Sequence, residues 1–429
     1  MPDVECFDTI GAIDPARWQG VTAGQDLAYS PAYMRYLESQ EPGCRPLLML
    51  GDLAACCLAE FSARSPFTSK PASLLTDRQY LRIGRPDEPA AVPELRSALA
   101  GHAGDALPPD LGGLLRRAWQ TFVTSVGMPV VVRNLWDSRV LLGTGLEPAA
   151  RRYALARMIE AVKSEAIRRG YRSVAFVYTP GEDAALQRAL RAAGFARALI
   201  GGLTAIDLRG CATFDDYLDR FRSRGRQRIR AEIRQFAEAG LRVQRIDHAA
   251  AVRQMAELEL ATSVRHDRPV TLPQQRNMHA ALSQAFGDRL VACGVTSGDR
   301  LVASAAMLRG DRELRVLLYG AGDEPIARLP GVYGSAVAYW PIRQALAWGL
   351  DTVRLGYEGY DAKLLRGARL LPRYIQVWTA SAAGRAFLAD WLSMADARAA
   401  QFFLELEAKY HNRCHAATPT YAGPHRLGR

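Results

Sequence analysis

The sequence Gly356-Tyr-Glu-Gly-Tyr-Asp-Ala-Lys-Leu-Leu-Arg-Gly367 is the stretch around which the rest of the chain is organised. It follows a predicted helix over 334–348 and a short apolar strand over 352–355. Two carboxylates, two tyrosines, a lysine and an arginine thus come directly after a buried strand, where α/β proteins commonly build their sites. The alternative interpretation is a solvated loop between a strand and a helix.

The order of elements around this stretch also occurs about 180 residues earlier. The earlier copy is predicted as a helix over 148–169, a buried strand over 174–178, a helix over 183–193 and a strand over 203–208. The later copy is predicted as a helix over 335–348 and strands over 352–355 and 374–378. Duplicated α/β domains are the simplest account of this pattern.

Length and composition agree with two globular domains. A chain of 429 residues exceeds what one hydrophobic core normally supports. The sequence is 49% hydrophobic and 23% charged, which is ordinary for globular proteins. It has no apolar run of membrane-spanning length and no basic-then-apolar leader at Met1, which predicts a cytoplasmic protein without stable membrane insertion.

The cysteines indicate neither a disulfide framework nor a metal site. There are seven, an odd number, without a CxxC motif or a Cys/His ladder. The pattern His411-Asn-Arg-Cys414-His415 resembles a metal cluster only superficially, because it lies in a polar end segment. We therefore expect no metal.

The formal charge of +11 suits a polyanionic partner such as nucleic acid or a phosphorylated cosubstrate. A genomic bias toward arginine would also produce this charge. The basic residues concentrate in a predicted helical region over 213–240, where four arginines spaced by four residues form one ridge: Arg222, Arg226, Arg230 and Arg234. Such a ridge is either a phosphate-binding surface or a solvated helix face.

The remaining segments complete the predicted order. In the N-terminal part we expect a helix after Pro31, a hairpin over 46–61, loops with one helix over 62–110, a helix over 114–126 and strands over 128–142. In the C-terminal part we expect strands over 242–246, 290–295, 301–308 and 314–320, a loop over 321–335 and a closing helix over 384–410.

Three features in this order resemble tandem GNAT-type acyltransferase domains, as in the Fem-like aminoacyltransferases and related peptidoglycan-biosynthesis acyltransferases. They are the basic segment from Tyr217 to Val243, the segment Tyr339–Gly349, and Lys363-Leu-Leu-Arg366-Gly367, which matches a lysine-x-x-arginine-glycine pattern of the family. The resemblance covers about residues 30–380 and implies two tandem GNAT-like domains with mixed, mostly antiparallel sheets flanked by helices. We expect a domain over 1–210 that is structural or on the acceptor side, because its copy of the stretch carries no lysine, and a donor-binding, catalytic domain over 211–380. The residue pattern further predicts a C-terminal helix over 381–415 and a disordered tail over 416–429.

The loop before the later helix bears on the donor. Enzymes of this superfamily that use CoA cradle its pyrophosphate with an Arg/Gln-x-x-Gly-x-Gly/Ala loop at a helix N-terminus. The segment Arg328-Leu-Pro-Gly331-Val-Tyr-Gly334 has one residue too many, and Ser335 follows it. The resemblance and the arginine ridge therefore favour aminoacyl-tRNA over acyl-CoA as cosubstrate, with no bound cofactor.

Acyl transfer to an amine needs a base, a placed amine and a stabilised oxyanion. The resemblance suggests that Lys363 stabilises the oxyanion or holds the 3′ end of the donor; the alternative is a surface lysine. Glu358 and Asp361 are candidates for the base or for recognition of the substrate amine, and Arg366 for binding a donor phosphate or an acceptor carboxylate. Further candidates for substrate binding lie near the predicted cleft: Tyr319, Tyr333, Tyr339, Tyr357, Tyr360, Arg328 and Ser335. Tyrosines at strand ends are otherwise often packing residues.

The leading hypothesis is therefore an N-acyltransferase that transfers an aminoacyl group from tRNA to an amine. The acceptor would be a cell-wall precursor, a small metabolite or a peptide natural product. An acyl-CoA-dependent enzyme is the first alternative, and a non-catalytic RNA-binding protein on the same scaffold is the second. No Walker loop, Rossmann fingerprint or Ser-His-Asp spacing competes with these hypotheses.

Overall fold

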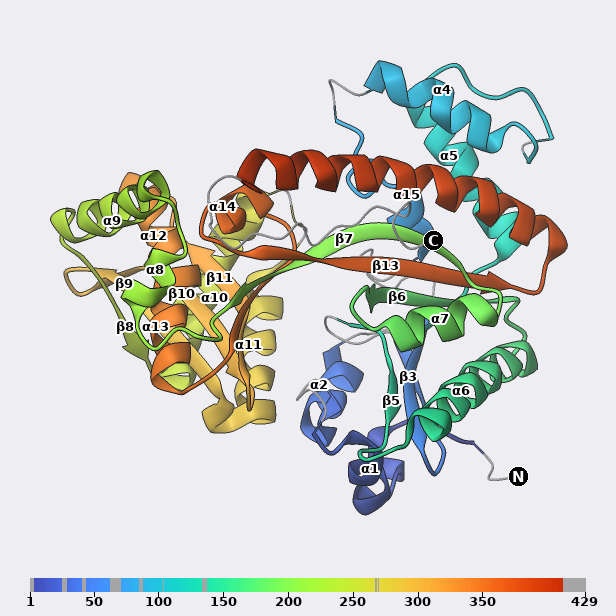
Figure 1. The fold of residues 1–429 in the computed structure, drawn as a ribbon, viewed down its shortest axis with the longest axis horizontal. Helices are drawn as coiled ribbons and strands as arrows, with labels where there is room; N and C mark the ends of the chain where they lie inside the picture. The colour runs from blue at the N-terminus through green and yellow to red at the C-terminus, as the bar shows by residue number, and fades with distance from the viewer. Residues whose placement is uncertain are drawn as a thin grey trace. The chain divides into compact units, whose positions relative to one another are not determined.

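The computed structural model describes residues 4–24, 29–40, 44–61, 71–84, 88–102, 104–132, 137–266, 268 and 270–411 (Figure 1). The tail predicted over 416–429, and residues 412–415 of the predicted C-terminal segment, lie outside the described residues. The chain forms two compact units, each built from two segments. Unit 1 comprises residues 1–201 and 372–405, and unit 2 comprises residues 202–371 and 406–429.

The units are not contiguous in sequence, unlike the expected domains over 1–210 and 211–380. Strand β7 (Ala196–Asp207) begins in unit 1 and ends in unit 2, and β13 (Arg369–Thr379) contributes most of its length to unit 1. The last helix, α15 (Ala382–His411), belongs to unit 1 as far as residue 405. Sequence periodicity could not predict that most of β13 and of α15 belong to unit 1, because periodicity indicates which faces are buried and not which neighbours bury them.

Unit 1 is a sheet with helices on both faces. Its strands follow the order β1-β2-β3-β4-β6-β13-β7, and β5 pairs with β3. The strands not yet delimited are β1 (Glu5–Phe7), β2 (Cys44–Leu50), β3 (Ala54–Phe61), β4 (Val130–Val132), β5 (Val140–Leu142) and β6 (Ser173–Pro180). The helices are α1 (Pro15–Thr22), α2 (Pro31–Gln40), α3 (Pro71–Thr76), α4 (Glu88–Leu99), α5 (Leu111–Thr121), α6 (Pro148–Arg168) and α7 (Ala184–Ala192).

Alternation along β6 sends side chains into two cores. Ala175 and Val177 pack with α3, α4, α5 and α15, whereas Val174 and Phe176 pack with α6 and α7. The expectation of a single helix over 62–110 was wrong, because both α3 and α4 form there. Helix α4 contains Pro93 in its interior, which obscured the helical pattern of its buried residues Ala91, Leu95 and Leu99.

Unit 2 has the strand order β7-β12-β11-β10-β9-β8, and its predicted hairpins are confirmed. The strands are β8 (Leu241–Ile246), β9 (Leu290–Ser297), β10 (Arg300–Arg309), β11 (Glu313–Ala321) and β12 (Thr352–Gly356). The helices are α8 (Phe214–Asp219), α9 (Ser223–Glu238), α10 (His248–Arg265), α11 (Leu272–Phe286), α12 (Pro330–Gly334), α13 (Trp340–Ala347) and α14 (Tyr360–Leu364). The predicted loop over 321–335 already contains α12, and a π-helical segment, η7 (Ser335–Tyr339), joins α12 to α13.

The core of unit 2 positions the stretch that follows β12. Helices α8, α9, α12 and α13 cover one face of the sheet, where Val295 and Val353 are buried, and α10 covers the other face over Ala292 and Ala306. Strands β11 and β12 are parallel and pair only over Glu313–Arg315 and Thr352–Arg354. Beyond this pairing β12 stays paired with β7 as far as Gly356, opposite Thr204, and the chain turns after that residue.

A buried polar chain joins α10 to α11. His248 Nε2 lies 2.9 Å from His279 Nδ1, and His248 Nδ1 lies 2.6 Å from the hydroxyl of Ser283. His279 Nε2 is 3.0 Å from the carboxylate of Glu259, which is also buried. Burial, followed by the neighbouring ring of His279, lowers the pKa of His248 to about 4, and Asp247 at the start of α10 opposes this shift.

We expect this lowered pKa to make the protein less stable in acid. The unfolded chain binds a proton at His248 below about pH 6.5, whereas the folded chain does so only near pH 4. Folding free energy is therefore lost as pH falls from 6.5 to 4, and His248→Gln should flatten that loss in urea unfolding measured across this range. His266→Gln, at an exposed position that follows α10, is the control and should leave the slope unchanged. Equal slopes in the wild type and His248→Gln would refute the prediction.

No helix among the described residues has the length and apolar character needed to cross a bilayer.

Candidate active site

The turn after β12 has a left-handed backbone at three of four residues. The φ angles are +78° at Gly356, +57° at Glu358 and +56° at Gly359. Glycine adopts such angles without penalty, but Glu358 is strained, and non-glycine residues held this way concentrate at functional sites. The hydroxyl of Thr204 on β7 donates a 2.6 Å hydrogen bond to the carbonyl of Gly356 and anchors the start of the turn. The chain therefore reverses within a few residues and begins α14.

Lys363 is buried at the end of α14, so the interpretation as a surface lysine is wrong. Its side chain is about 5% exposed, and Nζ donates a 2.8 Å hydrogen bond to the carbonyl of Tyr357. Burial lowers the pKa of Lys363 to about 7, and the nearby carboxylate of Glu358 limits that fall. A buried amine that exchanges its proton near neutral pH is suited to donate a hydrogen bond to a developing negative charge.

The hydroxyl of Tyr333 approaches the same glycine as the side chain of Lys363. A Cβ atom built on Gly359 would be 3.9 Å from Lys363 Cε and 4.0 Å from Tyr333 Oη, so both groups approach the same glycine. The ring of Tyr333 packs edge-on against that of Tyr319, with 5.1 Å between centroids. Burial raises the pKa of Tyr333 to about 12 and also raises that of Tyr319, so both hydroxyls remain hydrogen-bond donors at neutral pH.

Glu358 forms the polar rim of the site. Its carboxylate is 45% exposed and lies 2.9 Å from the guanidinium of Arg268, which follows α10. An exposed ion pair of this kind contributes little to stability and exchanges readily with water or a ligand. The electrostatic effect of Glu358 on the pKa of Lys363 places this carboxylate near the lysine.

Asp361 is held elsewhere. Its carboxylate accepts hydrogen bonds from Lys409, at 2.7 Å, and from Tyr410, both at the end of α15. These donors lower the pKa of Asp361, which makes it a weaker base. Tyr360 is also structural, because its hydroxyl accepts the amide proton of Gly202 at 3.2 Å. Tyr357 contributes its carbonyl to Lys363, and its half-buried ring stays a candidate for substrate contact.

Arg366 is a buried residue that links α14 to α9. It is about 4% exposed, and its Nη2 lies 2.7 Å from a carboxylate oxygen of Glu232 on α9. The same oxygen accepts a 2.6 Å hydrogen bond from Tyr339. Nη1 donates to the carbonyl of Ala362 at 2.8 Å. With these donors used internally, Arg366 positions α14 against α9 and is poorly placed to wrap around a phosphate.

One N–H donor of Arg366 is buried and is not used in the hydrogen bonds named above. Its Nε has no hydrogen-bond partner among the described residues. A Cβ atom on Gly334 would lie 2.9 Å from this Nε, so any other residue there would press on the guanidinium. Gly334 precedes η7, and π-helical segments occur frequently at functional sites. The guanidinium also lies 5.6 Å and 5.5 Å from the ring centroids of Tyr333 and Tyr339.

The predicted loop residues are less directly involved. Arg328 is exposed and lies 3.4 Å from Asp323, an acid that also pairs with Arg265. Ser335 is buried as the first residue of η7. Neither has a contact with Lys363 that the structure describes, so their assignment to substrate binding stays a prediction.

The arginines in and next to α9 fall into two groups: Arg228 contacts the backbone near α14, and others pair with acids of α8. Arg228 turns inward, and its guanidinium donates to the carbonyl of Leu365. Of the predicted ridge, Arg222 is the N-cap residue and Arg230 and Arg234 are exposed, whereas Arg226 is half-buried and donates to the carbonyl of Phe221. Arg226 lies 3.5 Å from Asp219 and Arg230 lies 3.8 Å from Asp215, so acids of α8 partly neutralise the ridge. These exposed pairs are weak and can yield to phosphates.

The sequence analysis missed three residues of this site. Arg268 was not recognised because it lies 90 residues before its partner Glu358. Arg228 and Glu232 were not singled out among the many charged residues of α9, although their spacing indicated their position on the helix. An acid that follows an arginine by four residues, between the buried Ile229 and Phe236, lies on the inner side of that helix.

We expect the unusual pKa of Lys363 to appear in the stability of the protein. Between about pH 7 and 10.5 the unfolded chain keeps a proton on this lysine that the folded chain has released, so stability rises with pH in this window. Relative to Lys363→Met, the unfolding free energy of the wild type should increase across the window by an amount on the order of 4 kcal/mol. Urea unfolding at several pH values measures the difference, and parallel curves would contradict the prediction.

The corresponding end of β6 in unit 1 has no lysine. Tyr178 there has a left-handed φ of +62°, as Glu358 has in unit 2. The polar groups nearby are satisfied internally, since the fully buried Arg373 pairs with Asp137 at 2.7 Å and with Glu182 at 2.8 Å. The assignment of the first copy to a structural or acceptor-side role stays a prediction.

Comparison with known proteins agrees with this architecture. The model of a FemAB-like family, described as peptidoglycan biosynthesis/recognition, matches residues 137–413. Among solved structures, FemX is similar with a TM-score of 0.52 and 10% identity, over 87% of this chain and 96% of FemX.

Two further solved structures are more distant. A tandem GNAT protein from the clavulanic acid biosynthesis pathway has a TM-score of 0.43 and 10% identity, over 88% of this chain and 99% of its own. The C-terminal domain of a lysylphosphatidylglycerol synthetase from Agrobacterium fabrum has a TM-score of 0.40 and 13% identity, over 63% and 82%. No curated protein matches the sequence significantly.

Proposed function

Because this chain belongs to the FemAB-like family of acyltransferases, we propose that it transfers an aminoacyl group from tRNA to an amine at the site around Lys363. The observation that supports this most is the lysine itself. A buried amine with a pKa of about 7 belongs to a side chain that approaches Gly359, as the hydroxyl of Tyr333 does, and the carboxylate of Glu358 lies nearby. These groups supply a hydrogen-bond donor and a base within one turn of the chain.

In the proposed reaction the acceptor amine attacks the ester carbonyl of the aminoacyl group. A C–N bond forms, and the carbonyl oxygen becomes an oxyanion that accepts hydrogen bonds from protonated Lys363 and from Tyr333. Glu358 takes the proton that the amine loses. The tetrahedral intermediate then collapses, the C–O bond to the ribose breaks, and the ribose oxygen leaves as a hydroxyl after accepting a proton. The base is assigned to Glu358 because Asp361 accepts hydrogen bonds from Lys409 and Tyr410, which lower the pKa of Asp361.

The choice of tRNA as donor rests on two features. The segment from Arg328 to Gly334 forms part of η6 (Pro325–Arg328) and then α12, which begins with a proline, so it has no open glycine loop of the kind that cradles a pyrophosphate. In the ridge, Arg226 and Arg230 pair with the exposed acids Asp219 and Asp215, and Arg226 also donates to the carbonyl of Phe221. The family description supports an acceptor related to the cell wall, and a small metabolite is the other class that fits an amine acceptor.

We expect the ridge to contribute to tRNA binding. Replacing Arg222, Arg226, Arg230 and Arg234 with glutamine should weaken binding of aminoacyl-tRNA by 10-fold or more at moderate salt, because fewer counterions are released when fewer phosphates are neutralised. The slope of log affinity against log salt concentration should fall by about one unit for each phosphate that the variant no longer neutralises. A filter-binding titration at several salt concentrations measures both quantities.

The control replaces four arginines of unit 2 that lie outside this ridge: Arg253, Arg289, Arg300 and Arg312. This variant has the same net charge and should retain the salt slope of the wild type. Equal affinity and slope in the ridge variant would make the ridge a solvated helix face. Product formation from purified acyl-CoA that is insensitive to RNase would establish the acyl-CoA alternative.

A further inference from the structure

Helices α6 and α7 of unit 1 share a surface that has no part in the proposed reaction. Both pack on the same side of the sheet, in the core that contains Leu155 and Leu190 (Figure 1). Lys163 of α6 also donates to the carbonyl of Ala193, directly after α7, at 3.2 Å. The side chains that the two helices direct away from this core therefore form one surface, here called the outer face of α6 and α7.

The acids within these helices are already matched by cations of the same segment. Helix α6 contains Glu160 and Glu165, and α7 contains no acid. Glu160 pairs with Lys163 at 2.8 Å, and the buried Glu165 pairs with Arg168 and Arg169. The other arginines of the two helices are in excess: Arg151, Arg152, Arg157, Arg188 and Arg191.

The acids that flank the helices do not balance this excess. Glu182 pairs with Arg373, and Asp183 caps α7 through the amide of Leu186. The remaining flanking acid is Glu147, the N-cap residue of α6. A surface with five arginines and so little opposing charge attracts a polyanion.

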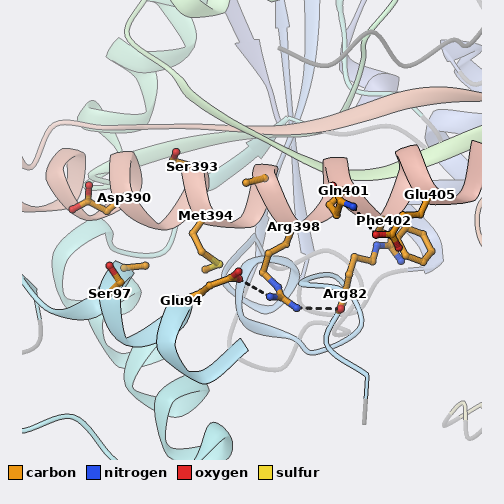
Figure 2. Close-up of a pocket in the computed structure, with 12 residues that line it drawn as sticks. Arg82, Glu94, Ser97, Asp390, Ser393, Met394, Arg398, Gln401, Phe402 and Glu405 are labelled. Atoms are coloured by element: carbon orange, nitrogen blue, oxygen red, sulfur yellow. Dashed lines mark hydrogen bonds and ion pairs between the residues drawn. The ribbon is translucent and has the colours of Figure 1, made fainter. Parts of the chain in front are cut away.

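These arginines are not used to hold the fold together. Arg152, Arg188 and Arg191 are exposed, and none has an ion pair or a side-chain hydrogen bond with a residue that the structure describes. By contrast, Arg398 lines a pocket between α4 and α15 and links Glu94 to the segment that precedes α4 (Figure 2). The outer face of α6 and α7 thus offers guanidinium groups that a partner can bind without breaking an internal contact.

The same face exposes two large apolar side chains, Tyr153 at 56% and Ile167 at 53%. Residues that recur every three or four positions lie along one stripe of a helix. The outermost stripe of α6 consists of exposed side chains that are small, apolar or already paired: Ala149, Tyr153, Ala156, Glu160, Ser164 and Ile167. Arg152 and Arg157 flank this stripe on opposite sides, because each residue advances about 100° around the helix.

These features fit a partner that accepts both cations and apolar side chains. We propose that the outer face of α6 and α7 docks on an anionic phospholipid bilayer, independently of the proposed reaction. The arginines would lie at the lipid phosphates, with Tyr153 and Ile167 at the boundary between headgroups and acyl chains. RNA phosphates would pair with the arginines but offer no apolar environment to Ile167. A second copy of the chain would bring two sets of arginines together, and like charges repel.

Sedimentation of the full chain with vesicles at physiological ionic strength tests the proposal. The wild type should bind vesicles of equimolar phosphatidylcholine and phosphatidylglycerol and should not bind pure phosphatidylcholine. The arginine variant carries glutamine in place of Arg152, Arg157, Arg188 and Arg191. It should bind about 100-fold more weakly or worse, since each cation near an anionic surface contributes about fivefold. Tyr153→Gln/Ile167→Gln should bind about tenfold more weakly, because two apolar side chains no longer leave water.

The charge-matched control carries glutamine in place of four exposed arginines of unit 2: Arg253, Arg289, Arg300 and Arg312. It should bind the anionic vesicles like the wild type, and circular dichroism establishes that each variant is folded.

Four results would overturn the proposal. One is the absence of binding of the wild type to the anionic vesicles. Another is an equal loss in the arginine variant and the control, which would indicate diffuse attraction. The third is full binding by Tyr153→Gln/Ile167→Gln, which would show that the apolar side chains do not enter the bilayer. The last is an arginine variant that loses affinity for tRNA but not for vesicles, which would assign the face to RNA.

Discussion

Lys363→Met should lower turnover by about 10²–10³-fold while the protein remains folded. The amine would no longer be available to the oxyanion, and removal of one such donor typically has an effect of this size. Methionine has a similar length and no charge, so it suits a position that is about 5% exposed. The sequence analysis left a surface lysine open as the alternative for this residue. Because Lys363 is buried, we expect the Lys363→Met variant to fold because methionine has a similar length, and not because the position is exposed to solvent.

The measurement is the initial rate of aminoacyl transfer at pH 7, with far-ultraviolet circular dichroism as the test of folding. Lys409→Met is the matched control, because Lys409 is an exposed lysine of the same unit that pairs with Asp361. That variant should lose less than a factor of three. If Lys363→Met retained the rate of the wild type, the assignment of the active site to α14 would be wrong.

Glu232→Ala should destabilise the protein by about 3–5 kcal/mol. The substitution removes the carboxylate that pairs with Arg366 at 2.7 Å and accepts from Tyr339 at 2.6 Å. A guanidinium that is only 4% exposed would then be left without its counterion, which is the costly case for a buried ion pair. The midpoint of urea unfolding measures the loss.

Two further variants separate this effect from a simple loss of side-chain volume. Glu257→Ala removes a half-exposed acid that pairs with Arg253, and it should cost no more than about 1 kcal/mol. The double variant Glu232→Leu/Arg366→Met removes both charges and should recover much of the stability. A cost for Glu232→Ala that equals the cost for Glu257→Ala would show that Arg366 does not depend on this partner.

Much of the fold was predictable because buried faces leave a regular trace in sequence. The hairpin of β2 and β3, the meander from β9 to β11 and the strand β12 were expected at nearly their observed bounds. The exchange of β13 and α15 into unit 1 was not predictable, because their apolar patterns specify burial without specifying a partner. Only one helix was expected over 62–110, where α3 and α4 form, because Pro93 in the interior of α4 obscures its helical pattern.

The site was predictable in its location and less so in its arrangement. Position after a buried strand made Lys363 and Glu358 candidates, whose roles stay a prediction, and the glycines around them indicated the tight turn that the structure has. The burial of Lys363 was not predictable, because it depends on the turn folding back so that Nζ meets the carbonyl of Tyr357. The roles of Asp361 and Arg366 were ambiguous, because their partners Lys409 and Glu232 lie 48 and 134 residues away.

The central claim is tested most directly by transfer of an isotopically labelled aminoacyl group from tRNA to a pool of cellular amines, followed by mass spectrometry. We predict that the wild type produces an amide with the mass of the labelled amino acid added to one acceptor. Prior treatment of the donor with RNase should abolish the product, and Lys363→Met should reduce it by about 10²–10³-fold. No labelled amide from tRNA, or an equal yield with Lys363→Met, would contradict the account.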